Sequence, residues 1–286
     1  MTISGFTFIK NGEILGYPFI ESIKSILPLV DEFVINVGES EDNTLELINQ
    51  INDPKIRVIQ SKWNDKMTDR GYVYGQQKMI AQYNCTSDWA FYLEGDEVVH
   101  EEDLEKIKQT CEKYVDDNEV EAVTFDYFHF YGNANSYLDS PAWYRREARI
   151  IKNSVRSYAP DGLFWLVLAK NKIGRYPNAV HSGAKMYHYG WVRSEEQMNL
   201  KSQKVQKYWN KKHENIDYTQ IDGEIIKEFT GTHPAIVSEW IPKVEGLFKA
   251  DPSYQLTRKE KKHRLMIKIE ELFGCELSKK HYKIIK

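Results

Sequence analysis

The sequence has few cysteines and no long apolar run. Its three cysteines are Cys85, Cys111 and Cys275, and no two of them form a Cys-x-x-Cys pair. A disulfide framework is therefore excluded, and a zinc site of the usual spacing is not expected. We expect a reducing compartment, the cytoplasm. No stretch approaches the roughly 18 consecutive apolar residues of a membrane-spanning helix, and the N-terminus lacks the basic and apolar segments of a signal peptide.

An excess of one charge sign is also missing. The formal net charge is −3 at pH 7, so nothing at the level of the whole chain indicates a nucleic-acid partner. The exception is residues 256–286, which contain ten Lys or Arg and four Glu. The simpler interpretation of this segment is the solvated face of a helix. The alternative is a peripheral contact with the anionic inner face of a membrane.

Short apolar segments typical of buried strands alternate with helical patterns through the first half of the chain. Strands are predicted at residues 3–9, 33–37, 56–59 and 89–93, and helices at residues 13–27, 44–51, 72–83 and 102–114. This order predicts an α/β fold with a mostly parallel central sheet flanked by helices.

The pattern changes in the second half of the chain. A long aromatic-rich strand is predicted at residues 122–130, followed by shorter strands at 149–151, 163–168 and 185–189, and by helices at 194–209 and 258–273. Gly274 is the expected C-cap of the last helix. We therefore divide the chain into an α/β half, a smaller mixed β half of the same domain, and a C-terminal, partly helical extension, at residues 1–115, 116–210 and 211–286.

An acidic turn, Glu94-Gly95-Asp96-Glu97, directly follows the fourth strand. In open α/β sheets, ligands bind outside the carboxyl ends of the strands. Two carboxylates one residue apart can hold Mg²⁺ or Mn²⁺, which prefer oxygen ligands and often share them with substrate phosphates. The alternative is an acidic turn that stabilises the N-terminus of the following helix. The position of the turn after the fourth strand favours the metal site.

Four segments together resemble the glycosyltransferases of family 2, which have a GT-A fold. They are Ile9-Lys10-Asn11-Gly12, the stretch from Val37 to Thr44, Gln76-Gln77-Lys78-Met79, and Leu93-Glu94-Gly95-Asp96-Glu97. The resemblance implies a Rossmann-like GT-A sheet. It also implies an inverting, metal-dependent enzyme that moves a sugar from a nucleoside-diphosphate sugar to an acceptor hydroxyl.

The resemblance also implies roles for individual residues. Glu94 and Asp96 would hold Mn²⁺ or Mg²⁺, with His188 beside them as a third ligand. The donor nucleotide would contact Ile9, Asn11, Glu39, Gln77, Lys78 and Gly95. Two departures stand out: Val37 and Gly38 replace aspartates that often contact the base, and Glu94 replaces an aspartate of the metal motif.

An inverting transfer needs a general base that accepts the proton of the acceptor hydroxyl. Asp161 is the candidate, because related bacterial sugar transferases have a loop acid about a dozen residues after an arginine-rich strand, and Asp161 follows Arg149 by twelve residues. The same Pro-Asp-Gly sequence is a strong turn signal. Asp139 and Glu147 are the alternative bases.

Two other functions remain open at this point. A sugar nucleotidyltransferase uses a similar sheet and metal, but its loop after the first strand is usually rich in glycine, unlike Lys10-Asn11-Gly12-Glu13. A non-catalytic glycan- or nucleotide-binding protein on a decayed transferase scaffold would explain the missing aspartates at positions 37 and 38. For the transferase, the acceptor is a saccharide-type molecule, free, lipid-linked or protein-linked.

Overall fold

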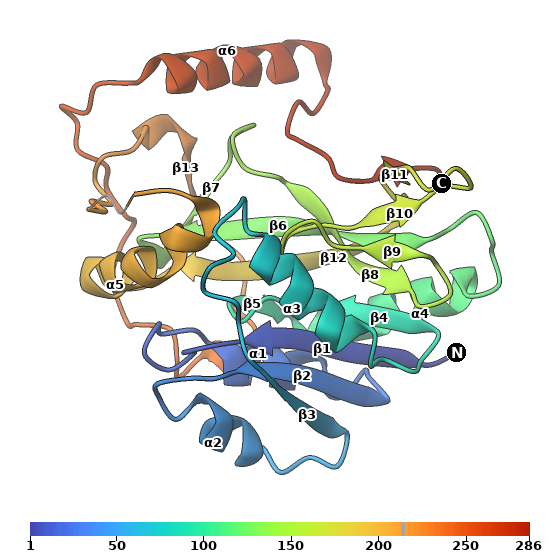
Figure 1. The fold of residues 1–286 in the computed structure, drawn as a ribbon. Coiled ribbons are helices and arrows are strands. Elements are labelled where there is room, and N and C mark those ends of the chain that lie inside the picture. The colour runs from blue at the N-terminus through green and yellow to red at the C-terminus, as the bar shows by residue number, and fades with distance from the viewer. Residues whose placement is uncertain (213–214) are drawn as a thin grey trace.

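Strands from both halves of the chain form one central sheet in the computed structural model, which describes residues 1–212 and 215–286 (Figure 1). The first half alternates strand and helix as predicted. Its elements are β1 (Ile3–Ile9), α1 (Phe19–Ile26), β2 (Glu32–Gly38), α2 (Thr44–Asn49), β3 (Ile56–Ser61), α3 (Tyr72–Gln82) and β4 (Trp89–Tyr92).

The four strands of the first half are parallel and lie in the order β3-β2-β1-β4. All of them therefore end at the same edge of the sheet. Ile9 pairs with Val37 and Val37 with Gln60 near this edge. Apolar side chains of α1, α2 and α4 (Leu104–Tyr114) pack on one face of the sheet, and those of α3 pack on the other. The predicted α/β fold is confirmed.

The chain after β4 extends the same sheet beyond that strand, with both parallel and antiparallel pairing. Its elements are β5 (Glu97–Val99), η1 (Glu101–Asp103), β6 (Ala122–Tyr131), β7 (Asn133–Leu138), β8 (Arg146–Lys152) and β12 (Asn178–Trp191), with a separate small sheet of β9 (Ser157–Tyr158), β10 (Leu166–Leu168) and β11 (Gly174–Arg175). β8 joins β4 to β6 by antiparallel pairing on both sides.

The long strand β12 pairs with both β6 and β5. It runs parallel to β6, with register shifts between His181 and Lys185, where Gly183 adopts a φ of 71°. It then pairs antiparallel with β5, so that His188 lies opposite Glu97. Through this pairing, a residue far away in the sequence reaches the acidic turn after β4.

The remaining chain surrounds the sheet. It contains α5 (Glu195–Val205), η2 (Gln206–Trp209), η3 (Gly223–Ile225), β13 (Ile226–Glu228), η4 (Ala235–Val237), α6 (Arg258–Phe273) and β14 (Lys283–Ile284). β13 pairs with β7, and β14 pairs with β12. Helix α6 has the predicted bounds, and Gly274 ends it at a φ of 60°. Within the described ranges, no helix is long and apolar enough to cross a membrane.

Several sequence-based boundaries are wrong, and two of them have a clear local cause. The first helix begins at Phe19 and not near residue 13, because the backbone first closes tight turns in which Leu15 and Tyr17 donate to the carbonyls of Asn11 and Gly12. The strand predicted at residues 163–168 is shortened to β10, because its first residues belong to the loop that follows Asp161.

Candidate active site

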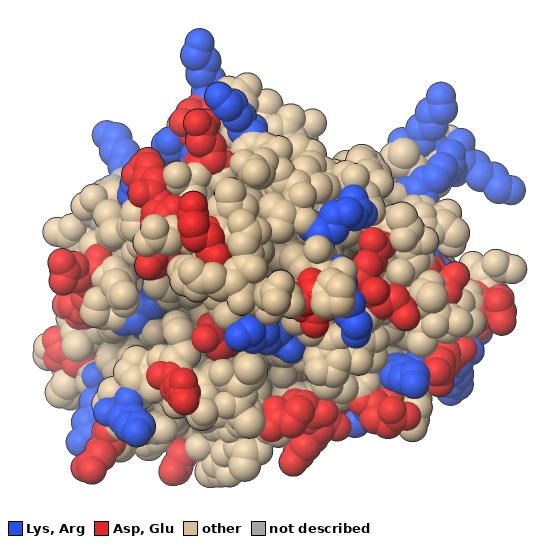
Figure 2. Space-filling view, turned by 90° about the horizontal axis from the view of Figure 1, so that it is seen from below, with Lys and Arg blue, Asp and Glu red and all other residues tan. Residues whose placement is uncertain are grey.

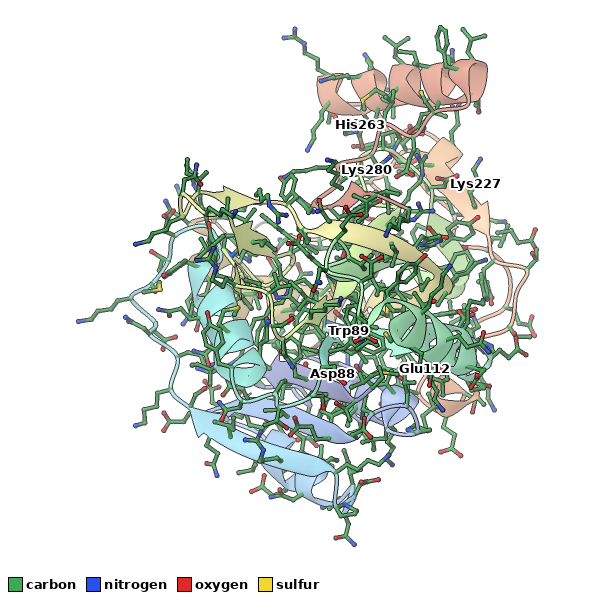
Figure 3. All side chains as sticks on the ribbon, turned by 90° about the vertical axis from the view of Figure 1, so that its right-hand side faces the viewer. Asp88, Trp89, Glu112, Lys227, His263 and Lys280 are labelled. Carbon is green, nitrogen blue, oxygen red and sulfur yellow. The ribbon has the colours of Figure 1, made fainter. Side chains whose placement is uncertain are left out.

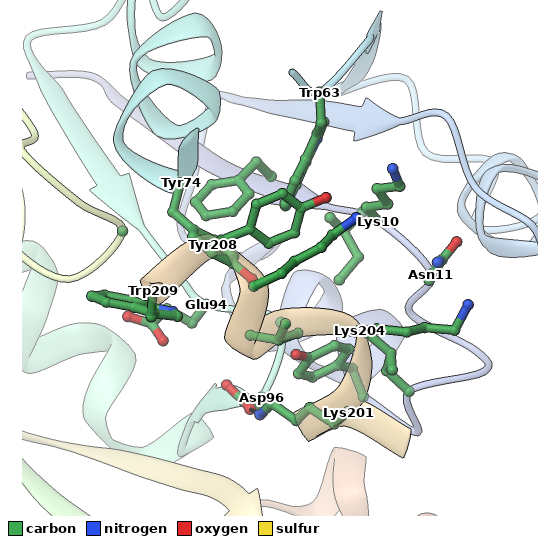
Figure 4. A pocket seen from close by; sticks show the side chains of 18 of the residues that line it. Lys10, Asn11, Trp63, Tyr74, Glu94, Asp96, Lys201, Lys204, Tyr208 and Trp209 are labelled. Atoms are coloured by element: carbon green, nitrogen blue, oxygen red, sulfur yellow. Dashed lines mark hydrogen bonds and ion pairs between the residues drawn. The ribbon is translucent and has the colours of Figure 1, made fainter. Parts of the chain in front are cut away.

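A cavity of about 600 Å³ lies at the carboxyl edge of the parallel strands (Figure 4). Strand ends and loops form its bottom. Residues from α5 and η2 cover it, and we call residues 195–209 the covering segment. Lining side chains include Phe8, Lys10, Tyr17, Trp63, Tyr74, Glu94, Asp96, Lys201, Lys204, Tyr208 and Trp209. The mixture of aromatic rings, cations and carboxylates suits a ligand with a planar ring and a charged group.

Asn11 shapes the loop at the end of β1. Its backbone adopts the left-handed conformation at a φ of 57°. Its side-chain oxygen accepts a hydrogen bond of 2.8 Å from the amide of Glu41, and the amide of Gly12 donates to the hydroxyl of Thr44. These bonds tie the β1 loop to the loop after β2. Asn11 and Ile9, two of the predicted donor contacts, both line the cavity.

Glu94, Asp96 and His188 come together at the bottom of the cavity. One donor atom from each lies within 4.8 Å of the others, and Nε2 of His188 is 3.6 Å from Oδ1 of Asp96. Gly95 passes between the two acids, where a Cβ atom would approach Ile9 to 2.9 Å. Two carboxylates and an imidazole form a donor set that suits Mn²⁺ or Mg²⁺.

A hydrogen-bond chain orients the His188 ring. Nε2 of His129 lies 2.7 Å from the carbonyl of Tyr144, so this nitrogen must donate. Burial and the neighbouring His188 hold the pKa of His129 well below its ordinary value, so His129 is neutral and its Nδ1 accepts. Nδ1 of His188, 2.9 Å away, is therefore the donor. In a neutral His188 ring, Nε2 then carries the lone pair that a metal-ligating histidine uses, and this atom faces Asp96.

Buried arginines balance the acidic turn. The Arg149 guanidinium bonds both oxygens of Glu97, at 2.9 Å or less, and reaches Glu94 at 3.1 Å. Burial and the nearby Glu97 carboxylate raise the pKa of Glu94 to about 7, against the opposing effect of Arg149. Burial alone would raise the pKa of Asp96, but Lys201, His188 and Arg193 outweigh it and hold that pKa well below its ordinary value.

Arg193 has unused donors next to Asp96. One of its terminal nitrogens lies 3.1 Å from Oδ2 of Asp96, and its guanidinium carbon sits 4.3 Å from the centre of the Tyr17 ring. Its Nε and Nη1 find no hydrogen-bond partner within the described part of the chain. Buried donors without partners are rare, so they mark a place where an anion fits. Lys201 lies 3.4 Å from the same Asp96 oxygen.

Three predicted donor contacts do not line the cavity. Gln77 is buried and accepts hydrogen bonds from Asn36 and Ser61. Lys78 is fully buried, with its ammonium 4.0 Å and 3.7 Å from the ring centres of Tyr92 and Trp165. Glu39 is exposed and lies 3.7 Å from a surface lysine. Their predicted contact with the nucleotide has no support from these positions.

Lys78 instead supports the loop of Asp161. Its ammonium donates to the carbonyls of Gly162 and Leu163, which line the cavity. Asp161 is half-buried and accepts a hydrogen bond of 2.8 Å from the amide of Leu163, so the predicted turn is present. Burial, followed by the charge of nearby Arg149, holds the pKa of Lys78 well below its ordinary value.

The alternative bases are engaged elsewhere. Asp139 pairs with Arg145 at 2.6 Å, and neither residue lines the cavity. Glu147 is fully buried beneath His281 of the C-terminal segment. Of the three candidate bases, Asp161 is therefore the one whose next residues, Gly162 and Leu163, line the cavity.

Trp63 takes the space of the missing aspartates. A Cβ atom on Gly38 would lie 2.5 Å from Nε1 of Trp63, so a larger side chain has no room there. Nε1 of Trp63 finds no partner among the described residues, and the ring packs against Tyr74 and Tyr208 at centroid distances of 5.3 Å and 5.6 Å. An aromatic wall therefore replaces the expected acidic one.

Sequence reasoning predicted a helix at residues 194–209 but not that this segment covers the cavity. Tyr208 donates from its hydroxyl to Asp65 and accepts, through its carbonyl, a 2.8 Å bond from the amide of Gly71. Lys204 pairs with Glu41 at 2.7 Å. A signal was present, because Lys201, Lys204 and Lys207 recur every third residue and lead into Tyr208-Trp209. All five side chains line the cavity.

Comparisons with known proteins give one match in sequence and several in structure. The model of the family described as glycosyl transferase family 2 matches residues 17–165, just over half of the chain. No curated protein sequence matches the chain.

Among solved structures, S. aureus TarS 1–349 in complex with UDP is 15% identical, with a TM-score of 0.43 over 70% of this chain and 64% of that one. Glucosyl-3-phosphoglycerate synthase from Mycobacterium tuberculosis, in complex with Mn²⁺, UDP-glucose and glycerol 3-phosphate, is 18% identical. Its TM-score is 0.33 over 44% of each chain. The chain spans between 39% and 65% of the TarS chains that it matches.

Proposed function

Because the chain belongs to glycosyl transferase family 2, we propose that it is a metal-dependent, inverting enzyme that transfers a sugar from a nucleoside-diphosphate sugar to a hydroxyl of a saccharide-type acceptor. The family match confirms the resemblance seen in the sequence, and it supports glycosyl transfer as the activity of the chain. The observation that carries the proposal of a metal-dependent transfer is the group of Glu94, Asp96 and His188 at the bottom of the cavity.

The residues of this group fit a divalent cation. Nε2 of His188 faces a carboxylate oxygen of Asp96 at 3.6 Å, and a divalent cation between the two atoms would be held by both. Glu94 and Asp96 supply the oxygen ligands that Mn²⁺ and Mg²⁺ prefer. When bound, the metal would stabilise the negative charge that develops on the departing diphosphate.

The cations and aromatic rings of the cavity support binding of the donor. The unused N–H groups of Arg193 and the ammonium of Lys201 lie beside the metal ligands, where they would bond phosphate oxygens. Trp63 and Tyr74 offer apolar faces for the nucleoside. Trp63 lies against Gly38 at the end of β2, where the sequence lacks the usual aspartates, so we propose that stacking contributes to base recognition here.

Asp161 is the proposed base. It would accept the proton of the acceptor hydroxyl while the sugar moves from the diphosphate to the hydroxyl oxygen with inversion at the anomeric carbon. Lys78 holds the two carbonyls that follow Asp161, and so fixes the loop relative to Tyr92 at the end of β4. A carboxylate placed on a rigid loop adjoining the cavity can meet the acceptor without relocating.

A thermal-shift panel tests the donor site. UDP, GDP, CDP and dTDP are each added with and without Mn²⁺ to the wild type, to Asp96→Asn and to the exposed control Glu39→Gln. A ligand at about 100 times its Kd stabilises the folded state by about 2.7 kcal/mol. We expect one diphosphate to raise the melting temperature only with Mn²⁺, in the wild type and Glu39→Gln but not in Asp96→Asn.

The outcomes separate the competing functions. A shift of the same size without Mn²⁺ would contradict the metal site. A metal-dependent shift without release of nucleoside diphosphate from any sugar donor, over a panel of saccharide acceptors, would favour the non-catalytic binding protein. Release of inorganic pyrophosphate from a nucleoside triphosphate and a sugar phosphate would favour the nucleotidyltransferase.

A further inference from the structure

Helix α6 stands at the margin of the molecule, away from the central sheet (Figures 1 and 3). Its inner face is anchored by two ion pairs. Arg264 bonds Asp222 through two nitrogens at 2.7 Å and 2.8 Å, and Glu270 bonds Arg145 at 2.8 Å and 2.9 Å. Ile267 packs beside them on a small apolar cluster. None of the sixteen residues of the helix is fully buried.

The opposite face of α6 is apolar and basic. Leu265, Ile269 and Leu272 recur at the spacing that places them on one side of a helix, and Phe273 lies next to them. Three of these four side chains are largely exposed: Leu265 at 59%, Leu272 at 77% and Phe273 at 71%. The cations around them are Arg258, Lys259, Lys261, Lys262 and Lys268, all exposed.

The acidic residues of α6 avoid this outer face. Glu260 lies in the capping box with Thr257, and Glu270 is the partner of Arg145. By helix geometry, Glu271 projects on the side of Arg264 and Ile267, toward the body. On the face seen in Figure 2, acids and bases are interspersed. The outer face of α6 differs, because its exposed apolar residues are surrounded by cations.

We propose that the outer face of α6 docks on an anionic lipid surface. Its apolar side chains would enter the boundary between headgroups and acyl chains, and its lysines would contact lipid phosphates. Charge complementarity favours this occupant over a second copy of the chain, because two such faces would bring like charges together. The proposal concerns membrane binding and does not depend on sugar transfer.

Sedimentation with vesicles tests the proposal on the full chain. We expect the wild type to sediment with phosphatidylglycerol vesicles, to stay in solution with phosphatidylcholine vesicles, and to be released by added salt. Lys261→Gln/Lys262→Gln/Lys268→Gln should weaken binding at least tenfold, because each cation near the surface contributes about a factor of five. Exposed lysines on other elements give the matched control, Lys66→Gln/Lys108→Gln/Lys170→Gln, which should bind like the wild type.

A second variant tests the apolar contribution. Leu265→Ser/Leu272→Ser/Phe273→Ser should lose vesicle binding with an unchanged melting temperature, because the three side chains are exposed. If both α6 variants bind phosphatidylglycerol as tightly as the wild type, or if the wild type does not bind it, the proposal is wrong. A wild-type dimer that the serine variant dissociates would also overturn it and would identify the face as a contact between two copies.

A fluorescent label on Cys275 reports where the contact is made. Cys275 is exposed just after α6, whereas burial raises the pKa of the Cys85 and Cys111 thiols to about 12, so an alkylating dye at neutral pH selects Cys275. We expect a blue shift of an environment-sensitive dye on adding phosphatidylglycerol vesicles. Vesicle binding without any spectral change would place the contact elsewhere and contradict the proposal.

Discussion

The bottom of the cavity is held by a buried ion pair, whereas two ion pairs of the covering segment, Lys204–Glu41 and Lys207–Asp65, are exposed. The Arg149–Glu97 pair is fully buried, but in the Lys204–Glu41 pair the glutamate side chain is 67% exposed. Breaking a buried pair costs about 3–5 kcal/mol, and an exposed pair contributes about 0–1 kcal/mol. The buried pair therefore fixes the bottom, and the two exposed pairs add little to the attachment of the covering segment. Substitutions at the bottom should change chemistry and metal binding, and those in the cover should change donor affinity.

The largest effect is expected at Asp161. Asp161→Asn should lower kcat by about 10²–10⁴, because the loop loses its proton acceptor, while nucleotide binding stays as in the wild type. Turnover is measured by release of nucleoside diphosphate, and binding by thermal shift. Asp139→Asn is the control and should keep most of the activity. An Asp161→Asn enzyme with normal kcat would assign the base to another residue.

A smaller effect is expected at His129, which bonds the proposed metal ligand His188. His129→Phe removes the acceptor that fixes the His188 ring, and loss of such a partner typically weakens metal binding by about 10–100-fold. Titration with Mn²⁺, followed by its paramagnetic resonance signal, measures this directly. His233→Phe replaces another histidine, one whose ring bonds the hydroxyl of Tyr189 and no side chain of the proposed metal ligands, and should leave Mn²⁺ affinity unchanged. Equal affinities in both variants would refute the orienting role of His129.

The smallest effect is expected in the covering segment, at Tyr208. Tyr208→Phe removes the hydroxyl that bonds Asp65, at a cost of about 1 kcal/mol. We expect the KM for the donor to rise by about fivefold, with kcat unchanged. Steady-state kinetics at saturating acceptor separates the two constants, and Tyr83→Phe, on the exposed end of α3, is the matched control. If Tyr208→Phe lowered kcat as much as Asp161→Asn, the expected difference between substitutions at the bottom of the cavity and in the covering segment would be wrong.

The position of the acidic turn at the bottom of the cavity could be predicted from the sequence, because neighbouring parallel strands end at the same edge of a sheet. That rule brings Asn11 and the acidic turn together without knowledge of any tertiary contact. It does not extend to Lys78, whose burial depends on Tyr92 and Trp165, two aromatic residues from separate segments. Helical pattern alone shows only that residue 78 lies on α3, and it does not show which face meets the cavity.

The position of the covering segment over the cavity escaped prediction for a related reason. Its position depends on single long-range contacts, such as the bond between the amide of Gly71 and the carbonyl of Tyr208, and no local pattern encodes them. His188 is an intermediate case. A family motif pointed to it, but its approach to Asp96 requires the bulged register of β12 against β6 and its pairing with β5, which depend on tertiary structure.

The two cations beside Asp96 have a thermodynamic consequence. Arg193 and Lys201 lie beside this carboxylate, so a metal ion alone would meet a site with little net attraction. A diphosphate would draw the two cations to itself and free the carboxylate for the metal. Each ligand should therefore raise the affinity of the other, and by linkage the factor must be equal in both directions. Such heterotropic cooperativity would let the protein load metal and donor together and release them together after transfer.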